Sequence, residues 1–404
     1  MSTFSGKWLT TFGSMELSQD GASVRGEYCS MSAACFLEGE VSHGRLVFTY
    51  QEPEVQGEGW FELSRGGKAF TGQYRPAGED HWQPWGGERV GFDGLWNSSF
   101  GPLRLLEVGD QVRGFYAVGG GATLEGRRKG DRLAFRYREP KARGRGAFEL
   151  AADGLSFQGE WRARGDDCWQ PWWGLRVRPQ PDLTWLVVIE APWQRFLDEQ
   201  EYAFGNMLRE FFARHSGVQV RHRFFANEPG LRKCLRDLLY IAEPIVLVLA
   251  THAGPEGVRV DGQTIGVPVL VEALGSVGNL RLLHFSACSL MEDPAVVERF
   301  RSFSDASCAA VSGYTTSVNW AASAIIEFTF LEMVLGQGRP PAEAAAQLLK
   351  LLPFAGEKGV AEGAFPAAGF CIVTPGPTGS AEAKDSPSGS GKRRRVTRHR
   401  PVRE

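Results

Sequence analysis

The chain has 404 residues and a formal net charge of −2, with 43% hydrophobic and 23% charged residues. This length exceeds one ordinary core at about 150 residues per domain, so we expect more than one domain. The composition is typical of globular proteins and argues against collagen, coiled-coil or wholly disordered chains. The charge is uneven, because residues 374–404 hold eight Lys or Arg and three acids, a net +5 that leaves −7 on the remainder.

The first residues contain no charged segment followed by an apolar one, so no secretory leader is expected. No window contains the roughly 18 consecutive apolar residues that a membrane helix needs. Seven cysteines without a C-x-x-C pair favour reduced thiols over a disulfide framework or a zinc site. We therefore expect a cytoplasmic protein with no metal, no cofactor and no membrane partner.

One pattern occurs twice in the first 178 residues, at an offset that falls from 88 to 87. The matching segments include Gly6-Lys7-Trp8 with Gly94-Leu95-Trp96, Tyr50-x-Glu52-Pro53 with Tyr137-x-Glu139-Pro140, and Trp82-Gln83-Pro84-Trp85 with Trp169-Gln170-Pro171-Trp172. Self-similarity at a fixed period indicates repeated structural units. We expect two related units, at residues 1–91 and 92–179.

Apolar and polar residues alternate within each unit, for example at residues 14–19 and 45–50. This period of two, broken by glycine-rich turns, predicts an antiparallel meander of about eight short strands per unit. Closure into a small barrel would remove exposed sheet edges. The units loosely resemble lipocalin-like or avidin-like barrels. Their repeated tryptophans either fill the barrel core or line a ligand cavity: Trp8, Trp82, Trp85, Trp96, Trp169 and Trp172.

From residue 183 to 373, apolar runs alternate with amphipathic stretches. Strands are expected at 184–189, 218–225, 244–250, 279–285 and 308–313, and helices at about 194–215, 228–241, 321–335 and 341–352. The run at 244–250 is nearly all apolar, as parallel strands covered on both faces must be. The predicted fold class is multidomain, with two all-β meander barrels followed by an α/β domain that has a mostly parallel sheet.

Residues 374–404 are rich in Ser, Gly, Pro, Lys and Arg and contain few large apolar residues. This composition predicts a disordered basic tail. The basic run at 392–395 is either a solubilising segment or a contact for nucleic acid or an acidic partner. We expect contact with nucleic acid only weakly and only through this tail.

Two reactive residues follow predicted strands directly, His252 after the third and Cys288 after the fourth. Such groups gather beyond the carboxyl ends of parallel strands, and neighbouring strands lie about 5 Å apart. An imidazole can take the proton of a thiol and later protonate a leaving amine. Backbone N–H groups of Cys288 and of Ala253 or Gly254 are the candidate oxyanion donors. The other interpretation is a structural cysteine and a turn-capping histidine.

Residues 183–373 resemble the caspase-like cysteine peptidases of clan CD, most closely their bacterial CHAT-type branch. The resemblance rests on a strand ending in Thr-His-x-Gly, a strand ending in Phe-Ser-Ala-Cys-Ser, the segment 311–320 and a closing helix after Gly338. It implies that Cys288 is the nucleophile and His252 the general acid/base of peptide-bond cleavage. The family usually has His-Gly, whereas Ala253 separates His252 from Gly254 here. This difference bears on which backbone N–H serves as the oxyanion donor and on its geometry.

In that family, the substrate residue before the cleaved bond lies between three loops. The corresponding loops here contain Glu190, Glu292, Asp293, Asn319 and Trp320. An acidic wall would favour Lys or Arg at that position. The alternatives are that Glu190 is a solvated cap, that Glu292 and Asp293 begin a helix, and that Trp320 belongs to the core. No role is predicted for His284, which is expected to pack in its strand, or for His215 and His222, which are expected at the surface.

Together these features predict a cysteine endopeptidase whose β repeats act as sensor or docking modules. The resemblance further implies a dedicated partner protein as substrate, in bacterial stress or defence signalling. A regulatory protein or ligand at the β repeats is the other expected partner. The alternative is a non-catalytic binding or scaffold protein with a degenerate peptidase domain and ligand-binding barrels.

Overall fold

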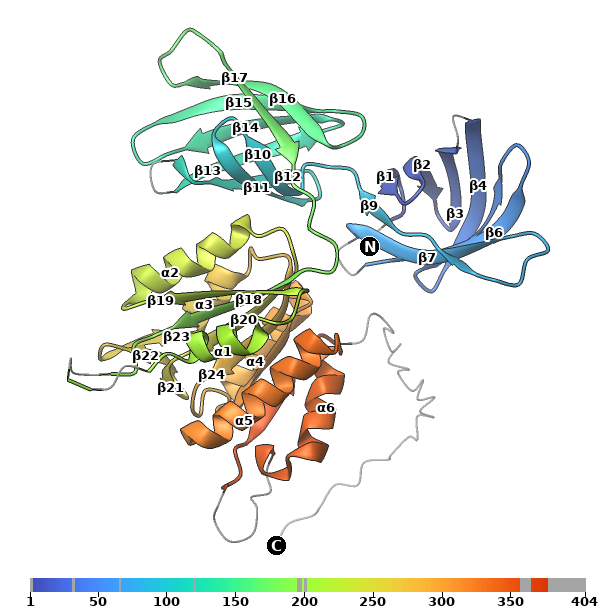
Figure 1. The fold of residues 1–404 in the computed structure, drawn as a ribbon. Helices are drawn as coiled ribbons and strands as arrows, with labels where there is room; N and C mark the ends of the chain where they lie inside the picture. Colours follow the sequence, from blue (N-terminus) through green and yellow to red (C-terminus); the bar gives the residue numbers. More distant parts are fainter. Residues whose placement is uncertain are drawn as a thin grey trace, which may run out of the picture.

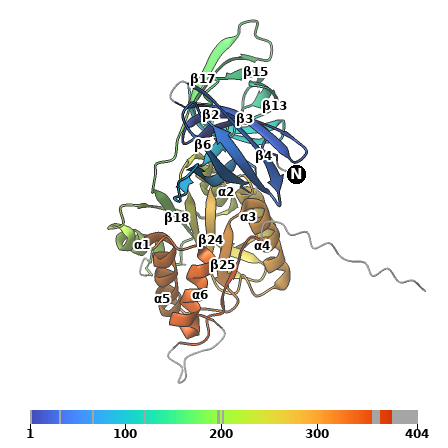
Figure 2. The same ribbon diagram turned by 90° about the vertical axis from the view of Figure 1, so that its right-hand side faces the viewer.

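The computed structural model describes residues 3–30, 33–64, 67–118, 121–194, 198–199, 202–356 and 365–376. The chain forms two β-barrels followed by an α/β unit (Figure 1, and Figure 2 in a second view). Apart from residues 374–376, the predicted basic tail lies outside the described residues. Within the described ranges, no helix combines the length and apolarity needed to span a membrane.

The first barrel is a ring of eight antiparallel strands with one short strand attached. Its strands are β1 (Gly6–Thr10), β2 (Gly13–Asp20), β3 (Ser23–Ser30), β4 (Ala33–Ser42), β5 (Arg45–Gln51), β6 (Gln56–Leu63), β7 (Ala69–Pro76), β8 (Gln83–Pro84) and β9 (Gly87–Arg89). Strands β1 to β7 pair in chain order, and β9 closes the ring by pairing with both β7 and β1. The short β8 pairs with β7.

The second barrel closes with eight strands in chain order. These are β10 (Gly94–Ser98), β11 (Gly101–Val108), β12 (Gln111–Tyr116), β13 (Ala122–Lys129), β14 (Arg132–Arg138), β15 (Arg143–Leu150), β16 (Ser156–Ala163) and β17 (Gln170–Arg176). Pairing of β10 with β17 completes the ring. The duplicated eight-strand meander predicted from the sequence is therefore confirmed.

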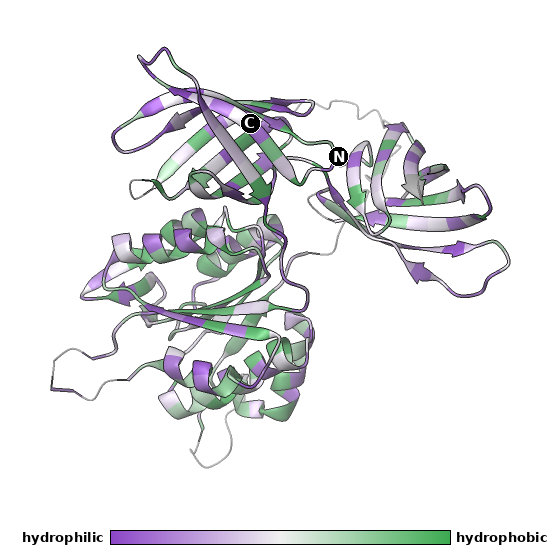
Figure 3. Cartoon of the chain, turned by 45° about the horizontal axis from the view of Figure 1, so that its top comes forward, coloured by the Kyte–Doolittle hydropathy of each residue, from purple (hydrophilic) through white to green (hydrophobic). Residues whose placement is uncertain are grey.

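Aromatic side chains fill both barrel interiors. Buried and exposed positions alternate along β5 and β14. Figure 3 shows hydrophobic and hydrophilic residues alternating along the barrel strands. Trp8, Trp85, Trp96 and Trp172 are each at most 2% exposed, and they pack against phenylalanines and tyrosines. These four tryptophans form core, while Trp82 and Trp169 lie at the surface.

The α/β unit is built on a six-stranded sheet in the order β19-β18-β20-β24-β25-β26. Its strands are β18 (Thr184–Glu190), β19 (Val218–Phe224), β20 (Ile245–Ala250), β24 (Leu280–Ser286), β25 (Ala310–Tyr314) and β26 (Phe370–Val373). The first five run parallel, and β26 is antiparallel to β25. All six residues of β20 are buried, since helices cover both faces of the sheet.

The helices of this unit divide between the two faces of the sheet. They are α1 (Phe204–Phe212), α2 (Glu228–Asp237), α3 (Val267–Leu274), α4 (Pro294–Ser307), α5 (Trp320–Leu331) and α6 (Pro341–Leu351), with the short turns η2 (Leu238–Tyr240), η3 (Glu332–Gly336) and η4 (Pro353–Ala355). Helices α2, α3 and α4 pack on one face. Helices α1, α5 and α6 pack on the other.

Three elements of the α/β unit were not predicted from the sequence. They are a small antiparallel sheet of β21 (His252–Gly254), β22 (Gly257–Val260) and β23 (Gln263–Gly266), and then α3 and β26; α4 was expected only in the alternative that Glu292 and Asp293 begin a helix. The small sheet consists of runs of three or four residues, which are too short to show periodicity. The first predicted helix, at 194–215, is shorter than expected and begins at Phe204.

The second barrel lies against the end of the sheet where the parallel strands begin. Phe115 packs on the core of the α/β unit, and Arg104 lies against Gly278, just before β24. Strand β11 also contacts η2, just before β20. The carboxyl ends of β20 and β24 lie about 20 Å away, at the other end of these strands.

Candidate functional site

Strand register places His252 and Cys288 at the same end of the sheet, beyond the carboxyl ends of two neighbouring strands. Strands β20 and β24 are neighbours and parallel, with Ala250 paired to Ser286. His252 and Cys288 each lie two residues beyond that pair, and the Thr251 N–H donates to the Ser286 carbonyl at 3.2 Å. Neighbouring strands lie about 5 Å apart, so the two reactive residues follow adjacent strands at the same edge of the sheet.

The Cys288 thiol lies on a sharp turn and meets the segment that follows β25. Ser289, the next residue, has a left-handed φ of 52°, which turns the chain away from the sheet. The Val318 N–H lies 3.5 Å from Cys288 Sγ, and the Ser317 hydroxyl lies 3.8 Å from it. Cys288 is partly exposed. The thiol in turn donates to the Val318 carbonyl at 3.7 Å, while the Val318 N–H and the Ser317 hydroxyl are placed to donate to a thiolate.

The predicted oxyanion donors come from two segments, the turn after β24 and the short strand β21. Among the described residues, no acceptor is paired with the backbone N–H of Cys288, which leaves it available to a ligand. Ala253 and Gly254 belong to β21, where they pair with Val258 and Gly257. Their role as donors stays a prediction.

His252 is exposed and has two neighbours that sequence reasoning missed. The Trp193 ring meets the imidazole edge to face, with centroids 4.9 Å apart. Arg259 lies directly across from His252 in the β21–β22 hairpin. Arg259 reaches the site because the hairpin pairs it with His252. The strands of this hairpin are too short to show a periodic pattern in the sequence.

A row of aromatic rings links His252 to Trp320. Trp193 meets Tyr202 at 6.2 Å between centroids, and Tyr202 meets Trp320 at 5.7 Å. Trp320 is 55% exposed, so it is not a core residue. Burial is the main cause that raises the pKa of Tyr202 to about 12. The predicted residue Trp320 and the predicted residue His252 thus border the same aromatic surface.

Glu190 is fully buried, and both of its oxygens are hydrogen-bonded within the protein. Oε1 accepts from Trp193 Nε1 at 2.6 Å and from the Phe204 N–H, while Oε2 accepts from the Gly205 N–H and lies 2.7 Å from His222 Nε2. Burial opposes ionisation, but these hydrogen bonds outweigh it and lower the pKa of Glu190. The carboxylate therefore anchors α1 and holds Trp193 beside His252.

The same contact corrects the expectation for His222. Its side chain is only 5% exposed and lies against Glu190, so the predicted surface position is wrong. His222 is on β19, the strand next to β18, and its register pairs it with Val188 rather than with Glu190. The contact depends on side-chain reach across the sheet, which the sequence does not show.

The remaining predicted binding residues begin helices. Asp293 Oδ1 accepts from the Ala295 N–H at 2.8 Å and caps α4, and Asn319 Oδ1 accepts from the Ala322 N–H at 2.8 Å and caps α5. Glu292 is exposed beside Asp293. Asn319 and Trp320 directly follow Val318, which contacts Cys288. Their contact with a substrate stays a prediction, as it does for Glu190.

A buried polar network supports the site from inside the sheet. His284 Nδ1 lies 2.9 Å from the Ser312 hydroxyl, and His284 Nε2 lies 3.5 Å from Glu327 Oε1. The Tyr314 hydroxyl donates to the same Glu327 oxygen at 3.0 Å. These residues come from β24, β25 and α5. Cys288 lies just after β24, and Val318 lies between β25 and α5. His284 is fully buried, as predicted.

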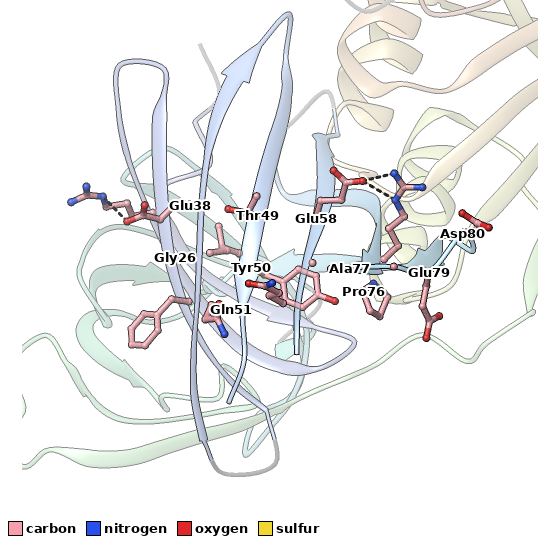
Figure 4. Close-up of a pocket in the computed structure, with 17 residues that line it drawn as sticks. Gly26, Glu38, Thr49, Tyr50, Gln51, Glu58, Pro76, Ala77, Glu79 and Asp80 are labelled. Atoms are coloured by element: carbon pink, nitrogen blue, oxygen red, sulfur yellow. Dashed lines mark hydrogen bonds and ion pairs between the residues drawn. The ribbon is translucent and has the colours of Figure 1, made fainter. Parts of the chain in front are cut away.

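A separate groove of about 1040 Å³ lies on the first barrel, along β3 to β7. Figure 4 shows Tyr50, Glu38 and Glu58 on its wall, with Glu58 joined to Arg75. Glu79 and Asp80 also line it, so carboxylates outnumber arginines. This groove is the candidate binding site of the repeats.

Within the described ranges, no group of three or more His, Cys, Asp or Glu residues is placed to hold a metal ion.

No protein-family model and no curated protein matches the chain. Structural similarity to transferrin binding protein B of Haemophilus parasuis, solved as a Tyr-167-Ala and Trp-176-Ala double mutant, covers 42% of this chain and 44% of that one, at 12% identity and a TM-score of 0.16. Similarity to oligopeptidase B of Leishmania major covers 70% and 64%, at 7% identity and a TM-score of 0.16. At these TM-scores, neither similarity supports a conclusion about fold or function.

Proposed function

We propose that the chain is a caspase-like cysteine endopeptidase, with Cys288 as nucleophile and His252 as general acid/base. The observation that supports this most is the β20–β24 register, which sets both residues two positions beyond a paired Ala250 and Ser286. The proposal also agrees with the partly exposed Cys288, whose backbone N–H has no acceptor among the described residues.

The proposed reaction has two stages. His252 takes the thiol proton, and the Cys288 thiolate attacks the scissile carbonyl carbon to form a C–S bond and an oxyanion. The Cys288 N–H and an N–H from β21 stabilise that oxyanion. Collapse breaks the C–N bond while His252 protonates the leaving amine, and water then hydrolyses the thioester with His252 as base.

The wall beside His252 suggests which side chain a substrate presents there. Trp193, Tyr202 and Trp320 offer ring faces and edges, which favour an apolar or aromatic side chain. Glu190 faces protein donors with both oxygens. A preference for Lys or Arg would therefore rely on the exposed Glu292.

The barrels act as sensor or docking modules in this proposal. The second barrel contacts the end of the sheet opposite to His252 and Cys288, so it does not cover the edge where these two residues lie. The groove on the first barrel is a separate place for a regulatory partner or ligand. A dedicated partner protein is the expected substrate.

Labelling with a thiol-reactive peptide probe tests the proposal. The chain should carry Cys168→Ser and Cys308→Ser, because both of these cysteines are exposed and would react unselectively. Burial raises the pKa of Cys371 to about 11 and raises that of Cys234, so these thiols are poor competitors. We expect selective modification of Cys288, located by mass spectrometry, and its loss in His252→Ala.

Two peptide probes, one ending in Phe and one in Arg, then compare the two substrate preferences. Faster labelling by the Phe probe, lost in Trp320→Ala, supports the aromatic wall. The proposed mechanism fails if Cys288 reacts no faster than Cys234 or if His252→Ala labels normally. Cys288→Ala and His252→Ala should each abolish cleavage of a protein substrate while leaving thermal unfolding unchanged.

The second candidate function is a non-catalytic scaffold whose barrels bind a ligand. The groove on the first barrel favours it, as does Ala253 between His252 and Gly254. In that case, a groove variant such as Tyr50→Ala would abolish partner binding, and Cys288→Ala would have no effect on any activity of the chain.

A further inference from the structure

We propose that the outer face of β14, β15 and β16 in the second barrel binds single-stranded nucleic acid. We name this surface the arginine face and define it by Arg136, Arg138, Arg143, Arg145 and Arg162, with Trp169 at its edge. The inference goes beyond the proposed peptidase function and does not depend on it. It also differs from the sequence-based expectation, which placed nucleic-acid contact in the basic tail alone.

Strand register brings these arginines together in directly opposed pairs. Arg138 faces Arg143 and Arg136 faces Arg145 between β14 and β15, and Arg145 faces Arg162 between β15 and β16. Directly opposed residues on one face of an antiparallel pair have Cβ atoms about 5 Å apart. Three like-charged pairs therefore lie next to one another across three strands.

Among the described residues, these guanidinium groups form no ion pair with an acid. No carboxylate of the described residues lies within ion-pair distance of any arginine of the face, and the four on β14 and β15 are exposed. Two acids border the face: Glu125 lies opposite both Arg113 and Arg136 and pairs with Arg113 at 3.9 Å, and Glu160 precedes Arg162 by two residues on β16. Opposed like charges cost stability, so an anionic ligand is the simplest reason for their grouping.

The duplicated barrel supplies an internal comparison. The counterpart of Arg145 is Glu58, and the counterpart of Arg162 is Arg75, which donates to Glu58 at 2.7 Å. The counterparts of Arg136 and Arg138 are Thr49 and Gln51. The same hairpin is thus neutralised in the first barrel and strongly basic in the second, although the barrel interiors match.

Trp169 favours nucleic acid over an acidic protein. Its ring is 40% exposed, and the guanidinium carbons of Arg145 and Arg162 lie 5.6 and 4.8 Å from its centroid. An exposed aromatic ring beside a row of cations matches the combination of base stacking and phosphate contact that single strands use. Paired bases in a duplex offer no free face to such a ring.

The arginine face is also open to a ligand. The second barrel rests on the α/β unit through β11 and β12, and β14 to β16 lie on the far side of the ring (Figure 1). A strand lying across β14, β15 and β16 would meet an arginine about every 5 Å.

Fluorescence anisotropy with labelled oligo(dT) of about 20 nucleotides tests the proposal. The full-length chain should carry glutamine at Lys392, Arg393, Arg394 and Arg395, so that the tail does not contribute. We expect R143Q/R145Q/R162Q to weaken binding about tenfold or more and to reduce the slope of log affinity against log salt by about 2. W169A should weaken binding about fivefold and should have no effect on an abasic strand of equal length.

Controls separate binding from folding. R75Q, at the matching position of the first barrel, should leave the affinity unchanged. The triple variant should unfold at the same temperature or higher, because it removes opposed like charges. Unchanged affinity in the triple variant or in W169A overturns the proposal. Equal binding of poly-glutamate or of anionic vesicles, lost with the same arginines and indifferent to Trp169, assigns the face to another partner and also overturns it.

Discussion

The two barrels of this chain share their interior and differ on their surface. Trp8 and Trp96 donate from Nε1 to the carbonyls of Phe4 and Phe92, at 2.8 and 2.9 Å. Their rings lie 5.2 and 5.1 Å from Phe70 and Phe157. Arg89 and Arg176 each lie 4.2 Å from the tryptophan centroid of their own barrel. The closing contacts of the ring are therefore preserved in detail.

On the outside, one hairpin has changed its charge. Residues 132–145 of the second barrel contain five arginines, one lysine and one glutamate, whereas residues 45–58 of the first contain one arginine and three glutamates. The inward positions set whether the barrel closes, and the outward positions are free to acquire partners. The two binding surfaces that we propose therefore lie on different outer faces of two copies of one fold.

Removal of the central tryptophan should have the largest effect, and the same one in both barrels. Trp8→Ala and Trp96→Ala each leave a cavity and an unpaired carbonyl, so each should cost about 3–5 kcal/mol of its barrel's stability. Hydrogen exchange followed on peptides of each barrel measures the two losses separately. A difference of more than about 2 kcal/mol would break the equivalence of the two interiors.

The stability of the α/β unit should fall in acid more than that of the barrels because of Glu190. Its lowered pKa means that its contribution to stability is present above the ordinary value of 4.5 and is lost as pH falls below it. Glu190→Gln should cost about 3 kcal/mol at neutral pH and flatten this acid dependence. Hydrogen exchange of α1 against pH measures both, and unchanged barrel peptides serve as the control.

At alkaline pH, the barrels should weaken together through matching tyrosines. Tyr28 and Tyr116 donate to Glu52 and Glu139 at 2.9 and 3.0 Å, and burial together with these hydrogen bonds raises both pKa values. Their contribution is present below the ordinary pKa of 10 and is lost as pH rises above it. Tyr28→Phe and Tyr116→Phe should each cost about 1 kcal/mol at neutral pH and reduce the alkaline loss. Unfolding between pH 7 and 11 would show unequal losses if the barrels differ inside.

The smallest effect should have opposite signs in the two barrels. Arg75→Gln breaks an ion pair with Glu58 and should destabilise the first barrel by about 0.5 kcal/mol. Arg162→Gln removes one of two opposed arginines and should stabilise the second barrel by a similar amount, about 0.5 kcal/mol. Urea unfolding at low and high salt measures both changes, and salt should shrink them. If both substitutions changed the free energy of unfolding in the same direction, charge on this face would not decide stability.

Much of the site follows from the sequence because strand ends can be read from apolar runs. The strands ending at Ala250 and Ser286 were predicted to within one residue, which is enough to place His252 and Cys288 at one edge of the sheet. Trp193, Tyr202 and Arg259 were missed because a loop and the four-residue strand β22 bring them to the site. The position of Glu190 at the end of a strand fits either a residue that lines the substrate site or one that anchors nearby segments. Only its four contacts in the structure, with Trp193, Phe204, Gly205 and His222, show that it is an anchor.

The sequence alone determined the duplication, the alternation that closes the barrels, the parallel strands and the positions of His252 and Cys288. Each depends on periodicity or order along the chain, which residue types report directly. The tertiary structure decided the rest: which strands lie side by side, that Glu190 meets His222, and that Arg136, Arg145 and Arg162 form one surface. These depend on register between segments, and a shift of one residue would turn each side chain to the opposite face.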